Sequence, residues 1–248
     1  MRRLLYTLVM LLAVLPADAF ALVEGRERIS LSGPWNYIVD PMNTGIYKYQ
    51  MQLHKPHKRY FADRHFFQDK TTLIEYDFDK APTLTVPGDW NSQLERLYYY
   101  EGSVWYRRTV DFHPQPGKRW FLYFGAVNYQ CMVGLNNTIL GTHKGGFTPF
   151  WFEVTDVLEE GENSLVVWVD NTRGASEVPT LNFDWWNYGG ITRDVLLVSV
   201  PEVYIKDYRL RFDGSAVEVD VTLDGGSGSV SLEIPELRIR KKACAGKD

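Results

Sequence analysis

The chain has 248 residues, 45% of them hydrophobic, and a formal net charge of −4 at pH 7. A chain of this length and composition can bury an ordinary hydrophobic core, which excludes a disordered protein. The mild acidity argues against a general nucleic-acid binder, because such proteins neutralise phosphates with a surplus of lysine and arginine.

The first 21 residues carry the ordered features of an export signal. Two arginines precede the apolar run 4–15, and small residues close the segment at Ala17, Ala19 and Ala21. The run is too short to span a bilayer, and no second apolar run of membrane length follows. We therefore expect residues 1–21 to be a signal peptide and the mature protein to be secreted or periplasmic, without a membrane span. A buried N-terminal strand is the alternative.

Cysteines and histidines offer no metal-ligand spacing. Cys131 lies in an apolar run and is expected in the core, and Cys244 is the only other cysteine. A secreted domain of this size can fold without a disulfide framework. The histidines, none of which pairs with a cysteine or acid at metal-ligand spacing, are His54, His57, His65, His113 and His143. We expect neither a metal nor any other cofactor.

From residue 29 the chain reads as short strands separated by turns. The expected strands are 28–33, 83–88, 104–112, 119–127, 131–136, 163–171 and 194–200. Alternation is clearest at 104–112, where Val104, Tyr106 and Phe112 share one face. No long helical period competes, so the sequence predicts an all-β sandwich of the jelly-roll kind. We expect Trp35, Trp90 and Trp105 to pack between the sheets, and also most of the aromatic residues Phe147, Phe150, Trp151 and Phe152.

The segment 46–72 interrupts this rhythm with a mixture of basic and aromatic residues. A loop of this length in a compact domain is usually functional or disordered. It forms either a functional wall or contact to another domain, or a solvated excursion, and the sequence leaves both interpretations open.

After Pro201 the pattern changes. Strands at 203–212 and 216–224 open a second β-domain, and 225–234 offers a third strand. An immunoglobulin-like sandwich needs about seven strands and roughly 100 residues, so three strands do not close one. Because their apolar faces have no opposing sheet, we expect this part to be poorly ordered. The alternation is lost in the basic stretch 235–248, which we interpret as a premature or out-of-frame end.

Several stretches together identify a family. They are PGDW at 87–90, EGSVWYRRTVDF at 101–112, the run from FGAVNYQ at 124–130 to NSLVVWVDN at 163–171, and NFDWWNYGGITRDVLLVSVP at 182–201. In this order they resemble the N-terminal sugar-binding domain of family 2 glycoside hydrolases, which are β-galactosidases, β-glucuronidases and β-mannosidases. The resemblance covers about residues 29–202. It implies a galactose-binding-domain-like jelly-roll β-sandwich at 22–202, followed by an incomplete immunoglobulin-like β-sandwich at 203–248.

The resemblance also implies a site in the segment D-x-x-N-Y-x-G-I-x-R. In the family its aspartate reaches from the jelly roll into the active site of a barrel domain and contacts sugar hydroxyls. The matching substrate-binding residues are Asp184, Asn187 and Tyr188. A carboxylate can accept two hydroxyl hydrogen bonds, and charge-assisted bonds are the stronger ones. The alternative is that Asp184 only pairs with Arg193 or caps the turn.

No residue of the chain is assigned to catalysis. In the family two glutamates on a (β/α)₈ barrel act as acid/base and nucleophile, and that barrel would follow the second β-domain. Glu159 and Glu160 lie in a turn beside a glycine and read as solvent-facing. The resemblance therefore implies the carbohydrate-binding part of a secreted β-glycosidase, which contacts a terminal β-linked sugar and has no activity of its own. It also implies contacts within the longer enzyme or between copies. A stand-alone carbohydrate-binding module and a purely structural β-sandwich are the alternatives.

Overall fold

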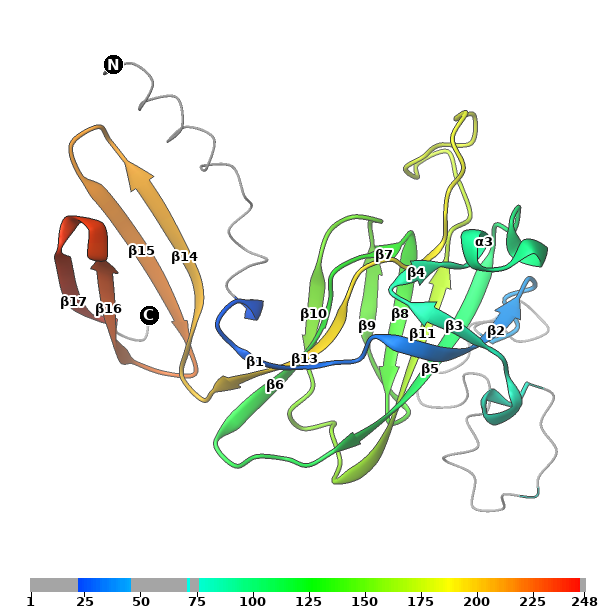
Figure 1. The fold of residues 1–248 in the computed structure, drawn as a ribbon, viewed down its shortest axis with the longest axis horizontal. Coiled ribbons are helices and arrows are strands. Elements are labelled where there is room, and N and C mark those ends of the chain that lie inside the picture. Colours follow the sequence, from blue (N-terminus) through cyan, green and yellow to red (C-terminus); the bar gives the residue numbers. More distant parts are fainter. Residues whose placement is uncertain (1–21, 46–70, 72–75, 246–248) are drawn as a thin grey trace. The chain divides into compact units, whose positions relative to one another are not determined.

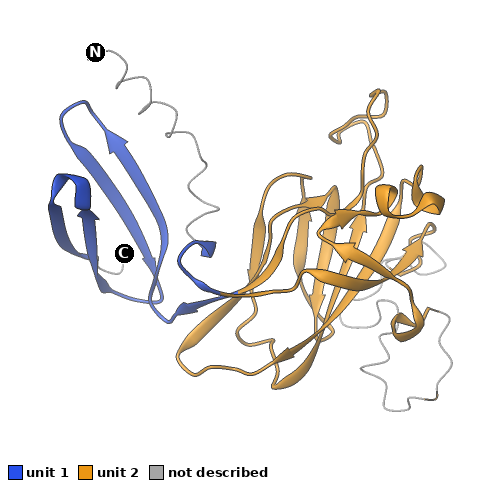
Figure 2. Cartoon of the chain, viewed as in Figure 1, with its two compact units in different colours: residues 1–27, 198–248 blue, residues 28–197 orange. Residues whose placement is uncertain are grey.

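The structure, a computed structural model, describes residues 22–45, 71 and 76–245. The chain divides into two compact units, one of residues 28–197 and one of residues 1–27 with 198–248 (Figure 2). The expected signal peptide 1–21 and most of the segment 46–72 lie outside the described residues.

Two large antiparallel sheets form the body of the larger unit (Figure 1). The six-stranded sheet has the order β3 Thr83–Val86, β2 Gly33–Asp40, β5 Ser103–Phe112, β11 Gly161–Asp170, β8 Gln130–Leu135 and β9 Thr138–Lys144. The four-stranded sheet has the order β1 Glu27–Ser30, β13 Val195–Pro201, β6 Lys118–Phe124 and β10 Phe150–Glu153. A third sheet joins the short strands β4 Gly88–Asp89, β12 Gly190–Ile191 and β7 Val127–Asn128. The all-β prediction is confirmed.

Helical segments of the larger unit are short. They include η3 Phe78–Lys80, α3 Trp90–Gln93 and η4 Glu95–Leu97. Asp89 caps α3, since its side chain accepts a hydrogen bond from the backbone N–H of Ser92. Carboxylates at this position satisfy a backbone N–H that has no partner within the helix. The cap fixes the chain between β4 and η4, a segment that later contributes to the site.

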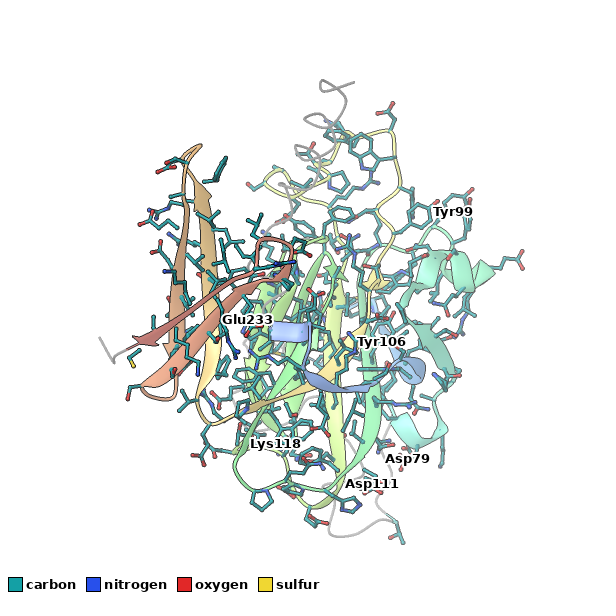
Figure 3. All side chains as sticks on the ribbon, turned by 60° about the vertical axis from the view of Figure 1, so that its left-hand side comes forward. Asp79, Tyr99, Tyr106, Asp111, Lys118 and Glu233 are labelled. Carbon is teal, nitrogen blue, oxygen red and sulfur yellow. The ribbon has the colours of Figure 1, made fainter. Side chains whose placement is uncertain are left out.

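Strand β5 is covered on both faces. Val104, Tyr106 and Phe112 are at most 2% exposed and face the main core, as the alternation predicts. Figure 3 shows Tyr106 in the interior of the unit. The intervening Trp105 and Arg107 are 1% and 6% exposed. On that second face lies a smaller apolar cluster of Ile38, Phe78, Trp105 and Val166. Burial on both faces holds β5 and its neighbour β11 at the centre of the sheet.

The main core contains aromatic side chains that the sequence placed there. Trp35 and Trp90 are fully buried in it, as predicted, whereas Trp105 is buried in the smaller cluster on the other face of β5 and not between the sheets. Cys131 is 1% exposed, also as predicted. Burial raises the pKa of its thiol to about 12, so the thiol stays protonated and unreactive near neutral pH.

Residues 204–245 form two hairpins. They pair β14 Tyr204–Phe212 with β15 Val217–Asp224, and β16 Gly228–Ile234 with β17 Ile239–Ala245 through η5 Pro235–Leu237. The predicted strands are present, but β17 is an additional strand in the stretch 235–248 that the sequence pattern did not predict. Arg238 adopts a left-handed backbone with φ 53°, which lets Ile239 pair with Ile234. Each strand pairs with a partner within its own hairpin, and the expected poor order of this part stays a prediction.

The first hairpin has one apolar and one polar face. Its register pairs Tyr208 with Val221, Leu210 with Val219 and Phe212 with Val217. Leu210 and Phe212 nevertheless remain 61% and 72% exposed. In the second hairpin Arg240 Nε lies 2.7 Å from an oxygen of Glu233, which Figure 3 labels. The apolar face of the first hairpin thus stays exposed.

An exposed charge cluster closes the end of the β5–β11 ladder. Phe112 pairs with Gly161, so the next residue, His113, lies beside Glu160, with Nδ1 and Oε1 2.5 Å apart. Asp111 Oδ2 lies 3.9 Å from Nε2 of the same ring. The hydrogen bond and the charge of Glu160 raise the pKa of His113 above its ordinary value, and Asp111 acts in the same direction. The Glu160 side chain is 70% exposed, which confirms its solvent-facing assignment.

The core assignment predicts a large difference between two leucines. Leu165 on β11 is 1% exposed, whereas Leu181 in the following loop is 57% exposed. Leu165→Ala should lower the free energy of unfolding by about 2–5 kcal/mol through lost burial and a residual cavity. Leu181→Ala should change it by about 0.5 kcal/mol or less. Urea unfolding followed by circular dichroism measures both, and equal effects would contradict the core assignment.

The histidine cluster predicts a pH dependence with a defined sign. Because folding raises the pKa of His113, its contribution to stability is fully present below the unfolded pKa and is lost as pH rises through the folded pKa. NMR titration of the ring should give a pKa above about 6.5 in the unmodified chain and a lower one in Glu160→Gln. Glu159→Gln is the matched control and should leave the value unchanged. A pKa at or below the ordinary value in the unmodified chain would refute the pairing.

Candidate functional site

The loop between β11 and β12 carries all three residues expected to contact a substrate. It covers residues 171–189 and extends past the ends of the strands of its unit, as the yellow segment of Figure 1 shows. Asp184 and Tyr188 are exposed, whereas Asn187 is 4% exposed. The three residues therefore share one loop but not one environment.

Asn187 is hydrogen-bonded on both sides of its amide. Its Oδ1 accepts from Asn128 Nδ2 at 2.8 Å, and its Nδ2 donates to the backbone carbonyl of Asn171 at 2.6 Å. Its own carbonyl accepts a bond from Asn171 Nδ2. These bonds tie the end of the loop to its beginning and to β7. In this structure Asn187 anchors the loop.

Further hydrogen bonds fasten the loop to α3 and to the segment that follows it. Asn91 Oδ1 accepts from the backbone N–H of Gly189 at 2.9 Å. Its Nδ2 lies within 2.9–3.2 Å of three backbone carbonyls, those of Leu97, Tyr98 and Tyr100. Asn171 Oδ1 accepts from the N–H of Gly102 at 2.9 Å. Asn91, Asn128, Asn171 and Asn187, which we call the asparagine clamp, are all at most 7% exposed.

Only one member of the clamp, Asn187, belongs to the site that the sequence predicts. Asn91, Asn128 and Asn171 each stand beside a short run of apolar or strand residues, in GDWN, AVNY and WVDN. An asparagine that directly follows buried strand residues is a usable signal, because a buried amide must be hydrogen-bonded. Their mutual proximity was not readable, since the residues lie far apart in the chain.

The two glycines after Tyr188 are required by close packing. A Cβ on Gly189 would lie 2.1 Å from the ring of Trp90 and 2.7 Å from Asn171 Cγ. Gly190 has φ 149°, and a Cβ there would lie 2.5 Å from the carbonyl oxygen of Gly88. The sequence predicted a sharp turn at this pair. The structure adds that the backbone passes directly against the indole and β4, which only glycine permits.

Aromatic rings surround the exposed part of the loop. The Tyr99 ring contacts Tyr98 and Trp186 edge to face, with centroids 4.8 and 5.4 Å apart. Phe183 and Trp185 form a second pair at 4.1 Å. Four of these rings are 41–75% exposed, and Trp186 is half-buried. Figure 3 shows Tyr99 at the outer edge of the unit beside the helical segment.

Asp184 makes no hydrogen bond or ion pair with any residue that the structure describes. The alternative of a pair with Arg193 is wrong, because Arg193 Nη1 donates to the carbonyl of Phe147 at 3.2 Å instead. Asp184 also caps no turn, in contrast to Asp213, which accepts from the N–H groups of Ser215 and Ala216 at 2.8 Å. Its carboxylate is therefore open to solvent and available to an external donor.

Within residues 22–45, 71 and 76–245, no group of three or more histidine, cysteine, aspartate or glutamate side chains is placed to hold a metal ion. Among these described residues, no helix combines the length and apolar character that crossing a membrane requires.

The clamp predicts that Asn187 matters more for stability than other loop asparagines. Asn187→Ala would leave Asn128 Nδ2 without one acceptor and the carbonyl of Asn171 without its donor. We expect the free energy of unfolding to fall by about 1–3 kcal/mol. Asn182→Ala, at an exposed position of the same loop, should change it by about 0.5 kcal/mol or less. Urea unfolding measures both, and equal small effects would show that the clamp carries no stability.

Comparison with known proteins places the fold and the loop in a family. Residues 29–201 match the family described as "Glycosyl hydrolases family 2, sugar binding domain". A putative β-glucuronidase of Formosa agariphila is 30% identical over 133 residues, which are 52% of this chain and 16% of that protein. A β-galactosidase of Priestia megaterium is 31% identical over 170 residues, which are 65% of this chain and 15% of that protein. A β-glucuronidase of Felis catus is 25% identical over 237 residues, which are 81% of this chain and 33% of that protein.

Solved structures agree with the sequence relatives. A Bifidobacterium dentium β-glucuronidase complexed with coumarin-3-O-glucuronide matches with a TM-score of 0.66 and 26% identity, over 91% of this chain and 41% of that one. A β-glucuronidase from an uncultured Clostridium species matches with a TM-score of 0.64 and 25% identity, over 94% of this chain and 39% of that one. The chain thus spans well under half the length of these relatives. Because the family match extends over most of its residues, the chain belongs to the family 2 glycosyl hydrolases, of which it represents the N-terminal sugar-binding domain and the strands that follow.

Proposed function

We propose that the chain is the carbohydrate-contacting N-terminal part of an exported β-glycosidase, and that Asp184 binds hydroxyls of a terminal β-linked sugar. The observation that carries the proposal is the solvent-open carboxylate of Asp184, which has no partner among the described residues although its loop is firmly anchored. A carboxylate without an internal partner is free to accept hydrogen bonds from a ligand.

The contact has favourable chemistry. Sugar hydroxyls are donors, and an ionised carboxylate accepts two of them in charge-assisted bonds, which are roughly twice as strong as neutral ones. The asparagine clamp orders the loop before the sugar arrives, so less conformational entropy is lost on binding. In this proposal Tyr188, which is 45% exposed, adds a second contact, while Asn187 orients both residues from beneath.

Hydrolysis belongs to a part of the enzyme outside this chain in the proposal. Retaining glycosidases use two carboxylates about 5–5.5 Å apart, and no such pair is assigned among the described residues. Relatives named β-glucuronidase and β-galactosidase are much longer than this chain. We therefore place the acid/base and the nucleophile on a barrel domain, and infer a β-glucuronide or β-galactoside as the substrate.

A stand-alone carbohydrate-binding module is the second candidate. It is favoured by the exposed rings of Tyr99 and Trp185, which are 75% and 55% exposed on this chain itself. Such a module would bind sugar in the absence of any barrel. Under either function we propose export through residues 1–21, and N-terminal sequencing of secreted material should find the chain starting near Phe20 or Leu22.

The proposal predicts the behaviour of a hybrid enzyme. The chain alone should not hydrolyse nitrophenyl β-glucuronide or β-galactoside above a buffer control. Joined to the second domain and barrel of a family member, it should hydrolyse one of them, and Asp184→Ala should lower kcat/KM about ten- to a hundred-fold through the lost charge-assisted contact.

Asp194→Ala is the matched control, because Asp194 is an exposed aspartate near the same loop, and it should keep the parent rate. A hybrid carrying Asp184→Ala that is as active as its parent would refute the contact. Turnover by the unjoined chain, in proportion to its concentration, would refute the assignment of catalysis to the barrel.

A further inference from the structure

One arginine of the Asp184 loop contacts two other residues of the loop, Phe183 and Trp186, and also Glu101 outside it. Arg173 lies at the start of the loop, and its Nε is 2.8 Å from Oε1 of Glu101. Its Nη1 donates to the backbone carbonyl of Phe183 at 3.4 Å. Its Cζ lies 5.4 Å from the ring centroid of Trp186. A single guanidinium thus meets a carboxylate, a carbonyl and an aromatic ring.

The contact points bracket Asp184. Phe183 directly precedes Asp184, and Trp186 follows it by two residues, so Arg173 contacts the backbone on one side of Asp184 and an aromatic side chain on the other. Asp184 itself makes no hydrogen bond or ion pair with the described residues. Its direction is therefore set by the backbone that carries it, and that backbone is restrained by Arg173.

The Arg173 contacts with Glu101, Phe183 and Trp186, which we call the brace, are supported by neighbouring segments. Glu101 precedes Gly102, whose N–H donates to Asn171 Oδ1 and whose carbonyl accepts from the Asn171 N–H at 3.3 Å. Trp186 packs on its other side against the ring of Tyr99. Since the Arg173 and Glu101 side chains are only 18% and 20% exposed, solvent weakens their ion pair less than that of an exposed pair.

We propose that Arg173 is a positioning residue for Asp184. Together with Glu101 and Trp186 it holds residues 183–186 in the conformation that presents the Asp184 carboxylate to a sugar. Glu101 supplies the carboxylate that the guanidinium needs, which leaves Asp184 uncompensated and free for hydroxyl donors. The sugar part of this role rests on the proposed function, whereas the brace is a property of the chain alone. Arginine suits the task because its planar guanidinium can pair with a carboxylate, donate to a carbonyl and lie over a ring at once.

Hydrogen exchange tests the brace on the full chain. Arg173→Met keeps the length of the side chain but removes its charge and donors. It should raise amide exchange in residues 181–186 about tenfold, while exchange in β5 and β11 stays unchanged. Arg173→Lys should give a smaller increase, because it keeps the charge opposite Glu101 and loses the fork. Arg119→Met is the matched control, since it breaks a similar ion pair, with Glu153, on β6 and β10. Unchanged exchange in Arg173→Met would overturn the brace.

Ligand-observed NMR titration with methyl β-D-glucuronide and methyl β-D-galactoside tests the positioning. Arg173→Met should weaken binding about tenfold, and the double variant Arg173→Met/Asp184→Ala should bind no worse than Asp184→Ala alone, because both changes act through one contact. Independent, additive losses would overturn positioning through Asp184. Two outcomes would refute the proposed sugar contact and with it the role of Arg173. In one, neither probe binds the unmodified chain; in the other, Asp184→Ala binds a probe as tightly as the unmodified chain. The exchange result then still reports separately whether the brace exists.

Discussion

Buried side-chain amides must find hydrogen-bond partners, and the loop that carries Asp184 is organised around this requirement. The members of the asparagine clamp give up water on folding, and each polar group left unpaired would cost about 1–3 kcal/mol. They satisfy one another and the backbone of residues 97–102 and 187–189. The same bonds tie together the beginning of the loop, its end and the chain after α3. A long loop with both ends tied in this way has far fewer conformations available to its exposed part.

The clamp works because the sheets deliver its members to one place. Asn171 directly follows β11, Asn128 belongs to β7, and Asn91 lies in the capped helix α3. Strands β5 and β11, buried on both faces, cannot shift without opening either the main core or the smaller cluster. Loops that rise from strand ends fixed in this way are suited to carry binding residues, because the scaffold supplies the precision that the loop lacks.

The loop separates structural and chemical roles along its length. Its base, at Asn187 and Gly189, is buried and fully engaged with neighbouring segments. Its outer part exposes Asp184 between two aromatic residues, with Arg173 holding the backbone from one side. Residues next to each other in the motif therefore act differently. The Asn187 amide is hydrogen-bonded within the protein, whereas the Asp184 carboxylate remains available to an external donor.

The sequence by itself determined the family, the buried positions of Cys131, Trp35 and Trp90, and seven strands of the larger unit, but it missed β2, β9 and β10. Alternation and turn residues report which side of a strand is apolar, and that information is local to the chain. The sequence pattern did not reveal β17, whose basic residues hide the alternation. It also did not reveal that both faces of β5 are covered, which buries Trp105 and Arg107. Only the tertiary structure decided that Asn91 meets Gly189, that Asn187 is buried while Asp184 is not, and that Arg173 reaches Phe183. The partner of a polar side chain depends on which distant segments the sheet topology brings together, and no periodicity in the sequence records that.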